Sequence, residues 1–202
     1  IFLEHSENID DFIVADTFTP TNIITYNRQV SNVEFLRAEV RFLRAYYHFE
    51  LIKRYNGVPI ITGLLDTEEG TNIPRSSFQN CIQFIVSECD SVKNSVIPTF
   101  QFFDNTREGR VTAGTVLALK SRALLYAASP LHNPEENILM WQQAAAAARD
   151  VIEMRRYSLD PDYRELFLAP KSFRSPEVIW SRRYGETNFV EKANYPLGTD
   201  GG

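Results

Sequence analysis

The residues best placed to do chemistry in this sequence are three acidic side chains near its end, Asp160, Asp162 and Glu165. Paired carboxylates hydrolyse glycosides when they lie roughly 5 to 9.5 Å apart across a cleft. Here the Asp-Pro-Asp sequence is better explained as a turn, with acidic side chains compensating the dipole of a following helix. Glu135 and Glu136 are adjacent at a predicted helix start and point apart. With no activated nucleophile and no phosphate-binding loop, we predict that the chain is not an enzyme and uses no cofactor.

The histidines and cysteines indicate no metal site. Cys81 and Cys89 are eight positions apart on one predicted helix, which separates their backbones by about 12 Å and excludes a bridge between them. Without a CxxC pair or a His/Cys cluster, we interpret them as two buried thiols. His48 has neither His5 nor His132 at a ligand spacing.

A row of basic side chains offers a different chemistry. Arg37, Arg41, Arg44 and His48 follow one another at spacings of four, three and four, so they share one face of a helix. Such a row is usually solvated or salt-bridged, and this is the interpretation we favour. The alternative is a surface that binds an anion or an acidic partner.

Composition bounds the fold and the partners. The 202 residues, 44% of them hydrophobic, suffice for one substantial core, so we predict a single helical domain over residues 1–202. The net charge of −5 is spread without a basic stripe, which argues against nucleic acid as a partner. No apolar run is long enough to span a bilayer.

The two ends are expected to be cuts in a larger protein. The chain opens on apolar residues typical of a helix interior, Ile1 to Leu3, and stops in a glycine-rich turn at Gly201 and Gly202. Its first twenty residues carry Glu4, Glu7, Asp10 and Asp11, unlike a signal peptide.

The row of basic residues belongs to the clearest predicted helix, which begins near Glu34 and ends at Asn56-Gly57, before Pro59. Its apolar residues form two adjacent stripes, Leu36, Val40, Leu43, Tyr47 and Leu51 beside Ala38, Phe42, Ala45, Phe49 and Ile52. A face this wide predicts packing against two neighbours.

Further helices follow. The second is expected from Ser76, with Gln79 completing a capping box, to Pro98. The third, Ala113 to Ser129, is dense in small residues, and the fourth, Glu136 to Arg155, contains five consecutive alanines; both features predict close helix packing. Ser175 to Ser181 is expected to be extended, because Val178 and Ile179 are β-branched and Pro176 disfavours helix before it.

These elements predict an all-α fold of antiparallel helix pairs with a short extended segment near the C-terminus. Helix pairs joined by turns favour a repeat array, in which each pair buries its face against the next. The small residues fit tetratricopeptide packing, but the Trp-Leu-Gly-Tyr pattern of that repeat is absent.

Two stretches resemble the SusD/RagB family in sequence, order and separation. They are Arg37–Tyr47 (RAEVRFLRAYY) leading into Tyr55–Pro59 (YNGVP), and Gly109–Gly114 (GRVTAG) leading into Leu124–Ala128 (LLYAA). Pro74–Ser77 and Ser175–Trp180 look like further landmarks of that family.

The resemblance implies a non-catalytic, lipid-anchored protein exposed on the outer membrane. Its tetratricopeptide-like helices would dock on a TonB-dependent SusC-like transporter, and its loops would hold a glycan or peptide nutrient for import. The chain would be the central helical part of such a protein, without its signal peptide, its lipid-bearing cysteine or its long C-terminal portion, so that membrane contact comes only through an anchor outside this chain. The alternative is a generic helical-repeat scaffold for protein–protein interaction.

If this part contributes to a ligand surface, the polar and aromatic segment after Ser181 is the candidate. Tyr184 would serve as a stacking platform, and Arg183 and Asn188 would donate hydrogen bonds to hydroxyl groups. Aromatic faces beside planar donors suit sugars, and this segment leads out of the helical body. The alternative for Tyr184 is simple packing.

Overall fold

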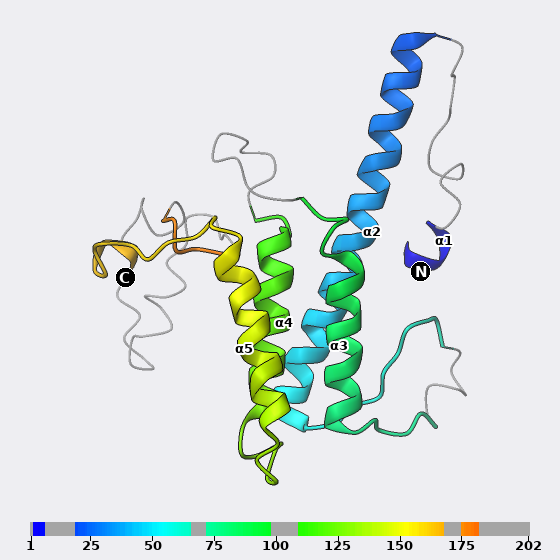
Figure 1. Cartoon of the computed structure of the whole chain (residues 1–202). Helices are drawn as coiled ribbons and strands as arrows, with labels where there is room; N and C mark the ends of the chain where they lie inside the picture. The colour runs from blue at the N-terminus through cyan, green and yellow to red at the C-terminus, as the bar shows by residue number, and fades with distance from the viewer. Residues whose placement is uncertain (1, 7–18, 66–71, 98–108, 168–174, 182–202) are drawn as a thin grey trace, which may run out of the picture.

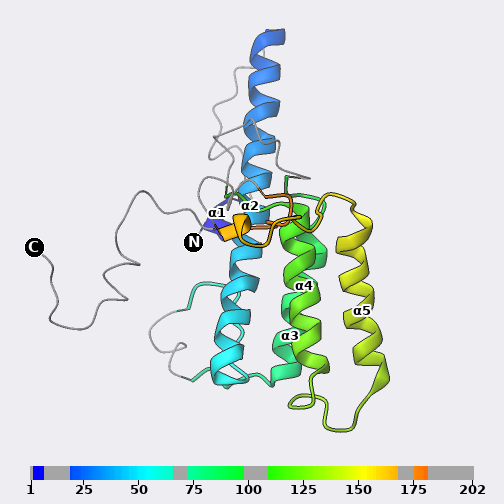
Figure 2. The ribbon, with the colours of Figure 1, turned by 90° about the vertical axis from the view of Figure 1, so that its left-hand side faces the viewer.

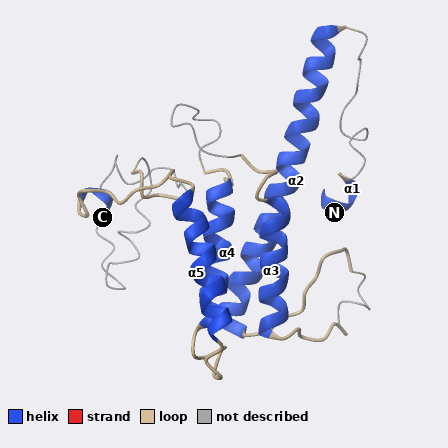
Figure 3. Ribbon diagram, viewed as in Figure 1, coloured by secondary structure: helices blue, strands red, loops and turns tan. Residues whose placement is uncertain are grey.

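The computed structural model describes residues 2–6, 19–65, 72–97, 109–167 and 175–181. Within these ranges the chain is helical and contains no strand, which confirms the all-α prediction (Figure 3). The α-helices are α1 (Phe2–His5), α2 (Pro20–Tyr55), α3 (Phe78–Val92), α4 (Ala113–Ala128) and α5 (Ile138–Glu153), followed by a 3-10 helix at Glu165–Phe167. No helix in the described ranges combines the length and apolarity needed to cross a bilayer.

Helix α2 is much longer than the sequence pattern predicts, because it begins at Pro20 rather than near Glu34. Thr19 caps it by accepting a hydrogen bond from the Asn22 amide at 3.2 Å, and Pro20 occupies the first turn, where it costs no backbone bond. The buried residues of α2 begin only at Ala38. Its first half therefore extends beyond the other helices (Figures 1 and 2).

The end of α2 is where the pattern places it, and Asn56 is the residue that adopts the left-handed backbone, with φ 62°. Gly57 is needed for a different reason. A Cβ at this position would lie 1.9 Å from the carbonyl oxygen of Ser76, so only glycine lets the loop before α3 pass this closely. The Ser76 amide also donates a hydrogen bond to the Val58 carbonyl oxygen at 3.1 Å.

This pairing explains why the predicted cap of α3 is wrong by one residue. The Ser76 backbone is hydrogen-bonded to Val58, so the helix begins one residue later. Ser77 is the N-cap, and its hydroxyl accepts a hydrogen bond from the Asn80 amide at 3.1 Å. Gln79 does not complete a capping box; its side chain donates to the carbonyl of His132 at 3.2 Å.

The core follows the order of the chain, with α2 packed on α3, α3 on α4 and α4 on α5. Phe42, Phe49 and Ile52 of α2 are almost fully buried, as the second apolar stripe predicts. Helices α4 and α5 are in extensive contact, and both bury small residues, namely Ala123, Ala127 and Ala128 of α4 and Ala144 and Ala147 of α5. The predicted close packing of these two helices is thus confirmed.

The thiols of Cys81 and Cys89 are both buried in this core and unpaired, as predicted. Burial raises the pKa of the Cys89 thiol to about 12. A thiol in this environment is protonated at neutral pH and unreactive, which supports a purely structural role.

The chain after α5 returns to the bundle. Tyr157 packs on Gly114, where a Cβ would lie 2.0 Å from the tyrosine oxygen. Ser175 to Val178 then form a turn, with the Val178 amide donating to the Ser175 carbonyl at 3.1 Å, so this part is not extended as predicted. The serine hydroxyl, bonded to Asp160 at 2.7 Å, fixes the turn.

Trp180 completes the return by packing on α2. Its ring meets Phe42 and Tyr46 edge-on, with centroids 5.6 and 5.3 Å away. Its indole nitrogen donates to the Gly109 carbonyl at 3.0 Å. The last described segment therefore ends beside α2, on the flank that carries Tyr46.

Candidate functional site

The row of basic residues on α2 is a structural network rather than an anion site. Arg41 and Arg44 both bind Glu88 of α3, with Nη2 atoms 2.7 Å from its two carboxylate oxygens. The Glu88 side chain is only 7% exposed. Its burial disfavours the charged form, but hydrogen bonds from Arg41 and Arg44 outweigh this, so the pKa of the carboxyl lies below its usual value. The favoured, salt-bridged interpretation is confirmed.

The residues at the two ends of the row, Arg37 and His48, also have hydrogen-bond partners. Arg37 donates to the Ser6 hydroxyl at 2.9 Å. His48 is buried, with its Nδ1 2.8 Å from the Arg44 carbonyl and its ring against Phe84. These contacts tie α1 and α3 to α2.

The acidic residues Asp160, Asp162 and Glu165 form a turn and the cap of the 3-10 helix. The Asp162 amide donates to Asp160 at 3.1 Å, and the Glu165 amide donates to Asp162 at 3.1 Å. They are therefore the turn chemistry expected from the sequence. No group of three His, Cys, Asp or Glu side chains in the described ranges could hold a metal ion.

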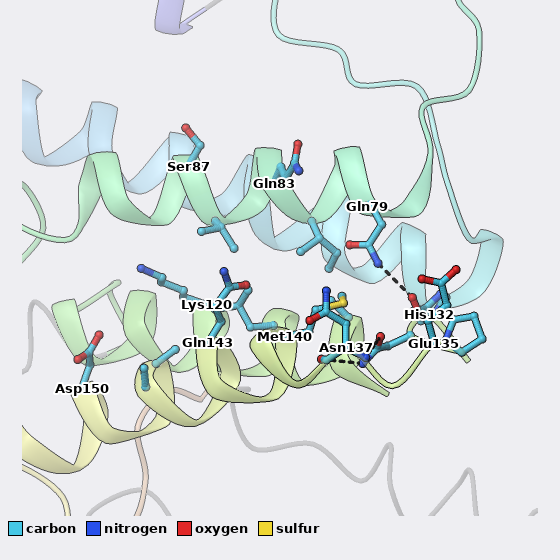
Figure 4. Close-up of a pocket in the computed structure, with 18 residues that line it drawn as sticks. Gln79, Gln83, Ser87, Lys120, His132, Glu135, Asn137, Met140, Gln143 and Asp150 are labelled. Atoms are coloured by element: carbon cyan, nitrogen blue, oxygen red, sulfur yellow. Dashed lines mark hydrogen bonds between the residues drawn. The ribbon is translucent and has the colours of Figure 1, made fainter. Parts of the chain in front are cut away.

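A groove of about 900 Å³ lies between α3 and α5, with α4 behind it (Figure 4). Apolar members come from all three helices and include Ile82, Val86, Leu124 and Met140. Polar members include Gln83, Ser87, Gln143 and Asp150. Figure 4 shows Gln83 and Ser87 on α3 facing away from α5, so they stand at the rim.

One end of the groove is closed by the loop between α4 and α5. Gln79 holds this loop through the His132 carbonyl, and the His132 ring stacks on Phe78 with centroids 3.5 Å apart. Asn133 is buried and accepts from the Asn137 amide at 2.8 Å, which folds the loop back on α5. Burial lowers the pKa of His132, so its imidazole is neutral at pH 7 and adds no charge to the groove.

The described lining of the groove combines apolar and polar side chains. None of the described residues that line it is Phe, Tyr or Trp, so it offers no aromatic platform for stacking. Lys120, its cation, is held by Asp90 at 2.8 Å. Apolar positions inside a polar rim are the pattern of a surface that receives a segment with apolar side chains on one face.

The residues predicted from the sequence to bind a ligand, Arg183, Tyr184 and Asn188, lie outside the described residues. The groove itself was missed. Its sequence trace is faint: Gln79, Gln83 and Ser87 follow one another at intervals of four, a polar row beside the apolar face of α3. Three separate helices make the groove, so local spacing alone does not reveal it.

Fold and contacts together define a helical scaffold of packed helices joined by ion pairs such as those of Glu88. A family model for SusD-like proteins, described as "Starch-binding associating with outer membrane", matches residues 21–125, which are 105 of the 202 residues. The chain therefore belongs to the SusD-like family, and the resemblance drawn from its sequence is confirmed.

Similarity to individual proteins supports this family assignment. SusD-like protein P25 of Formosa agariphila is 22% identical over 189 residues, covering 94% of this chain and 32% of the relative. A SusD-like protein of Bacteroides fragilis superposes with a TM-score of 0.64 at 27% identity, covering 77% of this chain and 28% of that one. Surface glycan-binding protein A from Bacteroides uniformis shares the fold, with a TM-score of 0.62 at 18% identity, over 77% of this chain and 32% of that protein. The chain spans about a third of the length of such relatives.

Proposed function

We propose that this chain is the central helical part of a longer protein that binds a glycan oligosaccharide at the outer-membrane surface. The protein delivers this nutrient to a TonB-dependent SusC-like transporter and catalyses no reaction. The single observation that carries the proposal is the family match over α2, α3 and most of α4. The helical framework is consistent with it, because ion pairs such as those of Glu88 with Arg41 and Arg44 join its helices.

Binding is tested with the full-length protein and a panel of soluble oligosaccharides, followed by calorimetry. We expect one glycan class to bind and to be recovered uncleaved after long incubation. Release of shorter sugars would overturn the non-catalytic part of the proposal, and absence of binding across the panel would overturn the glycan part.

Within that protein we propose Tyr184 as a stacking platform for the glycan, with Arg183 and Asn188 as hydrogen-bond donors. Trp180, four residues before Tyr184, packs on α2. Replacing Tyr184 with Ala should weaken binding by about two- to tenfold, because aromatic contacts are worth about 0.5–1.5 kcal/mol. Tyr163→Ala, which removes an exposed tyrosine from the turn near the 3-10 helix, is the matched control. Equal affinity in the two variants would remove Tyr184 from the site.

Location at the outer surface and attachment through a lipid are further parts of the proposal. They are tested by treating intact cells with protease and by labelling the protein with a fatty-acid analogue. Degradation by external protease and incorporation of the label are expected. A protein found only in the cytosol would instead favour the generic helical-repeat scaffold.

A second function is favoured by the groove between α3 and α5. We propose that it receives a loop of the transporter, since its apolar positions and polar rim match a polypeptide and lack a sugar platform. Ala146 lines the groove and is exposed, whereas its neighbour Ala145 is exposed but does not line it. Ala146→Trp should fill the groove and reduce co-purification of the transporter, while Ala145→Trp should leave it unchanged. Equal recovery with both variants would exclude the groove as the contact.

A further inference from the structure

The first apolar stripe of α2 differs from the second, because three of its five side chains are exposed: Leu36 by 41%, Tyr47 by 61% and Leu51 by 44%. Tyr55, four positions after Leu51, is exposed by 60% and extends this row. We call these residues the outer stripe. Tyr47, Leu51 and Tyr55 follow at intervals of four, on the side of α2 that faces away from Phe42 and Phe49. Helix α2 does contact two neighbours, α3 and, through Phe49 and Tyr126, α4, but the outer stripe stays exposed.

Segments lie along both flanks of the outer stripe without covering it. On one flank Trp180 packs against Tyr46, whose ring in turn meets Tyr47 with centroids 5.6 Å apart. On the other flank Arg44 donates to the Thr62 carbonyl at 3.0 Å, which brings the loop after α2 alongside the helix. That loop adds further exposed apolar residues, Ile61, Leu64 and Leu65.

A row of exposed aromatic and aliphatic side chains on a long helix is the mark of a surface that another element covers. The contacts on the two flanks indicate from which side the covering segment reaches the outer stripe. The chain that ends the described region reaches α2 at Trp180, next to Tyr46 and hence next to Tyr47. The described chain after α5 therefore ends, at Ser181, near the flank of α2 that borders the outer stripe.

We propose that the outer stripe is an internal docking face, covered by the polypeptide that follows Ser181 in the full-length protein. The proposal rests on the proposed function in one respect, namely that this chain is part of a longer protein. Relatives are about three times its length, since it covers 28% and 32% of them, so ample chain lies outside it. A segment of the same polypeptide also binds at a lower entropic cost than a separate partner does.

Thiol labelling of the full-length protein tests the proposal. The native cysteines are 0% and 1% exposed, so an introduced cysteine reports on its own position. Tyr47→Cys and Leu51→Cys probe the outer stripe, and Ile152→Cys, at the exposed end of α5, is the control. We expect the two stripe cysteines to react at least tenfold more slowly than the control, at every protein concentration.

Each other occupant gives a distinct result that overturns the proposal. Equal labelling rates would mean that nothing covers the stripe. Protection that fades on dilution would mean a second copy of the chain, and protection only after the transporter is added would mean that partner. Circular dichroism confirms that each variant is folded before labelling.

Photo-crosslinking identifies the segment without relying on a destabilising change. A photoreactive amino acid replaces Tyr55, which is 60% exposed, and the crosslinked peptides are sequenced by mass spectrometry. Crosslinks to residues after Ser181 support the proposal, and crosslinks only to other parts of the protein overturn it. Glycan titration of the same sample distinguishes failure of this proposal from failure of the proposed function. A protein that binds no glycan can still form the crosslink, and a protein without the crosslink can still bind glycan.

Discussion

The α2–α3 contact and the α4–α5 contact join helices in two different ways. Between α2 and α3, a buried carboxylate, Glu88, is held by two arginines across the interface. Between α4 and α5, the buried groups are mostly methyl side chains such as Ala127 and Ala144. The first contact fixes the register of the helices through directed hydrogen bonds, whereas the second fixes their distance through the absence of bulk.

Because of this difference, each contact should tolerate a different kind of substitution. A contact made of alanines has no side chain that can move aside, so it should be sensitive to added volume and insensitive to charge. A contact built on a buried ion pair should be sensitive to loss of either charge and to pH. A single substitution should therefore weaken either the α2–α3 contact or the α4–α5 contact and leave the other intact.

The largest effect is expected from added volume in the α4–α5 contact. Ala144→Phe should lower the free energy of unfolding by about 3 kcal/mol, because a phenyl ring has no space in a close-packed helix interface. Urea unfolding monitored by circular dichroism measures the change. Ala145→Phe, on the exposed side of the same helix, should change stability by less than about 0.5 kcal/mol. Similar losses in both variants would mean that helix propensity, rather than the close contact, is responsible.

Loss of the buried carboxylate should come next. Glu88→Gln keeps the shape but leaves Arg41 and Arg44 without a charged partner, and we expect a loss of about 2 kcal/mol. Breaking a fully buried pair costs about 3–5 kcal/mol, and we reduce that figure because Arg41 is 37% exposed and partly solvated. The same urea unfolding experiment measures it. A variant as stable as the wild type would show that the arginines are adequately hydrated without Glu88.

The pH dependence of that difference is the next prediction. The pKa of Glu88 is lowered in the folded state by its arginine hydrogen bonds against the opposing effect of burial. A carboxyl with a lowered pKa contributes stability that is present above its unfolded value of about 4.3 and is lost as pH falls through the folded value. The stability difference between wild type and Glu88→Gln should therefore be constant near neutral pH and shrink below about pH 4.3. Thermal unfolding of both proteins between pH 7 and pH 3 measures it; a gap that stays constant to pH 3 would contradict the assignment.

Much of the helical framework could be predicted from the sequence, because the relevant signals are local. Pro130 and the run of small residues locate α4 and α5 to within about two residues of their ends. The start of α2 was missed by fourteen residues, since no residue of its first half is fully buried and this half carries no regular apolar period. The cap of α3 was misplaced because two adjacent serines can both serve, and only the contact with Val58 decides between them.

The sites were harder to predict, because they depend on contacts between distant positions. The row of basic residues on α2 is visible in the sequence, but its partner Glu88 lies 44 positions from Arg44 and shows no sign of the pairing. The groove needs three helices in place before its lining residues meet. The predicted sugar-binding residues, Tyr184, Arg183 and Asn188, stay a prediction that the binding experiment above tests.

The smallest effect should come from an ion pair of the same type at the surface. Asp90, also on α3, accepts from Lys120 of α4 at 2.8 Å and from Lys93 at 3.2 Å, but its side chain is 40% exposed. Water can replace the lost bonds here, so Asp90→Asn should cost less than about 0.5 kcal/mol, although the substitution matches Glu88→Gln in chemistry. Added salt should remove even this difference, because surface charges are screened within about 10 Å at 0.1 M, whereas the cost of Glu88→Gln should persist. Urea unfolding of both variants at low salt and in 0.5 M sodium chloride measures this. If the two substitutions cost the same and respond alike to salt, the contact at Glu88 is a surface ion pair in energetic terms, and the distinction between the two helix contacts fails.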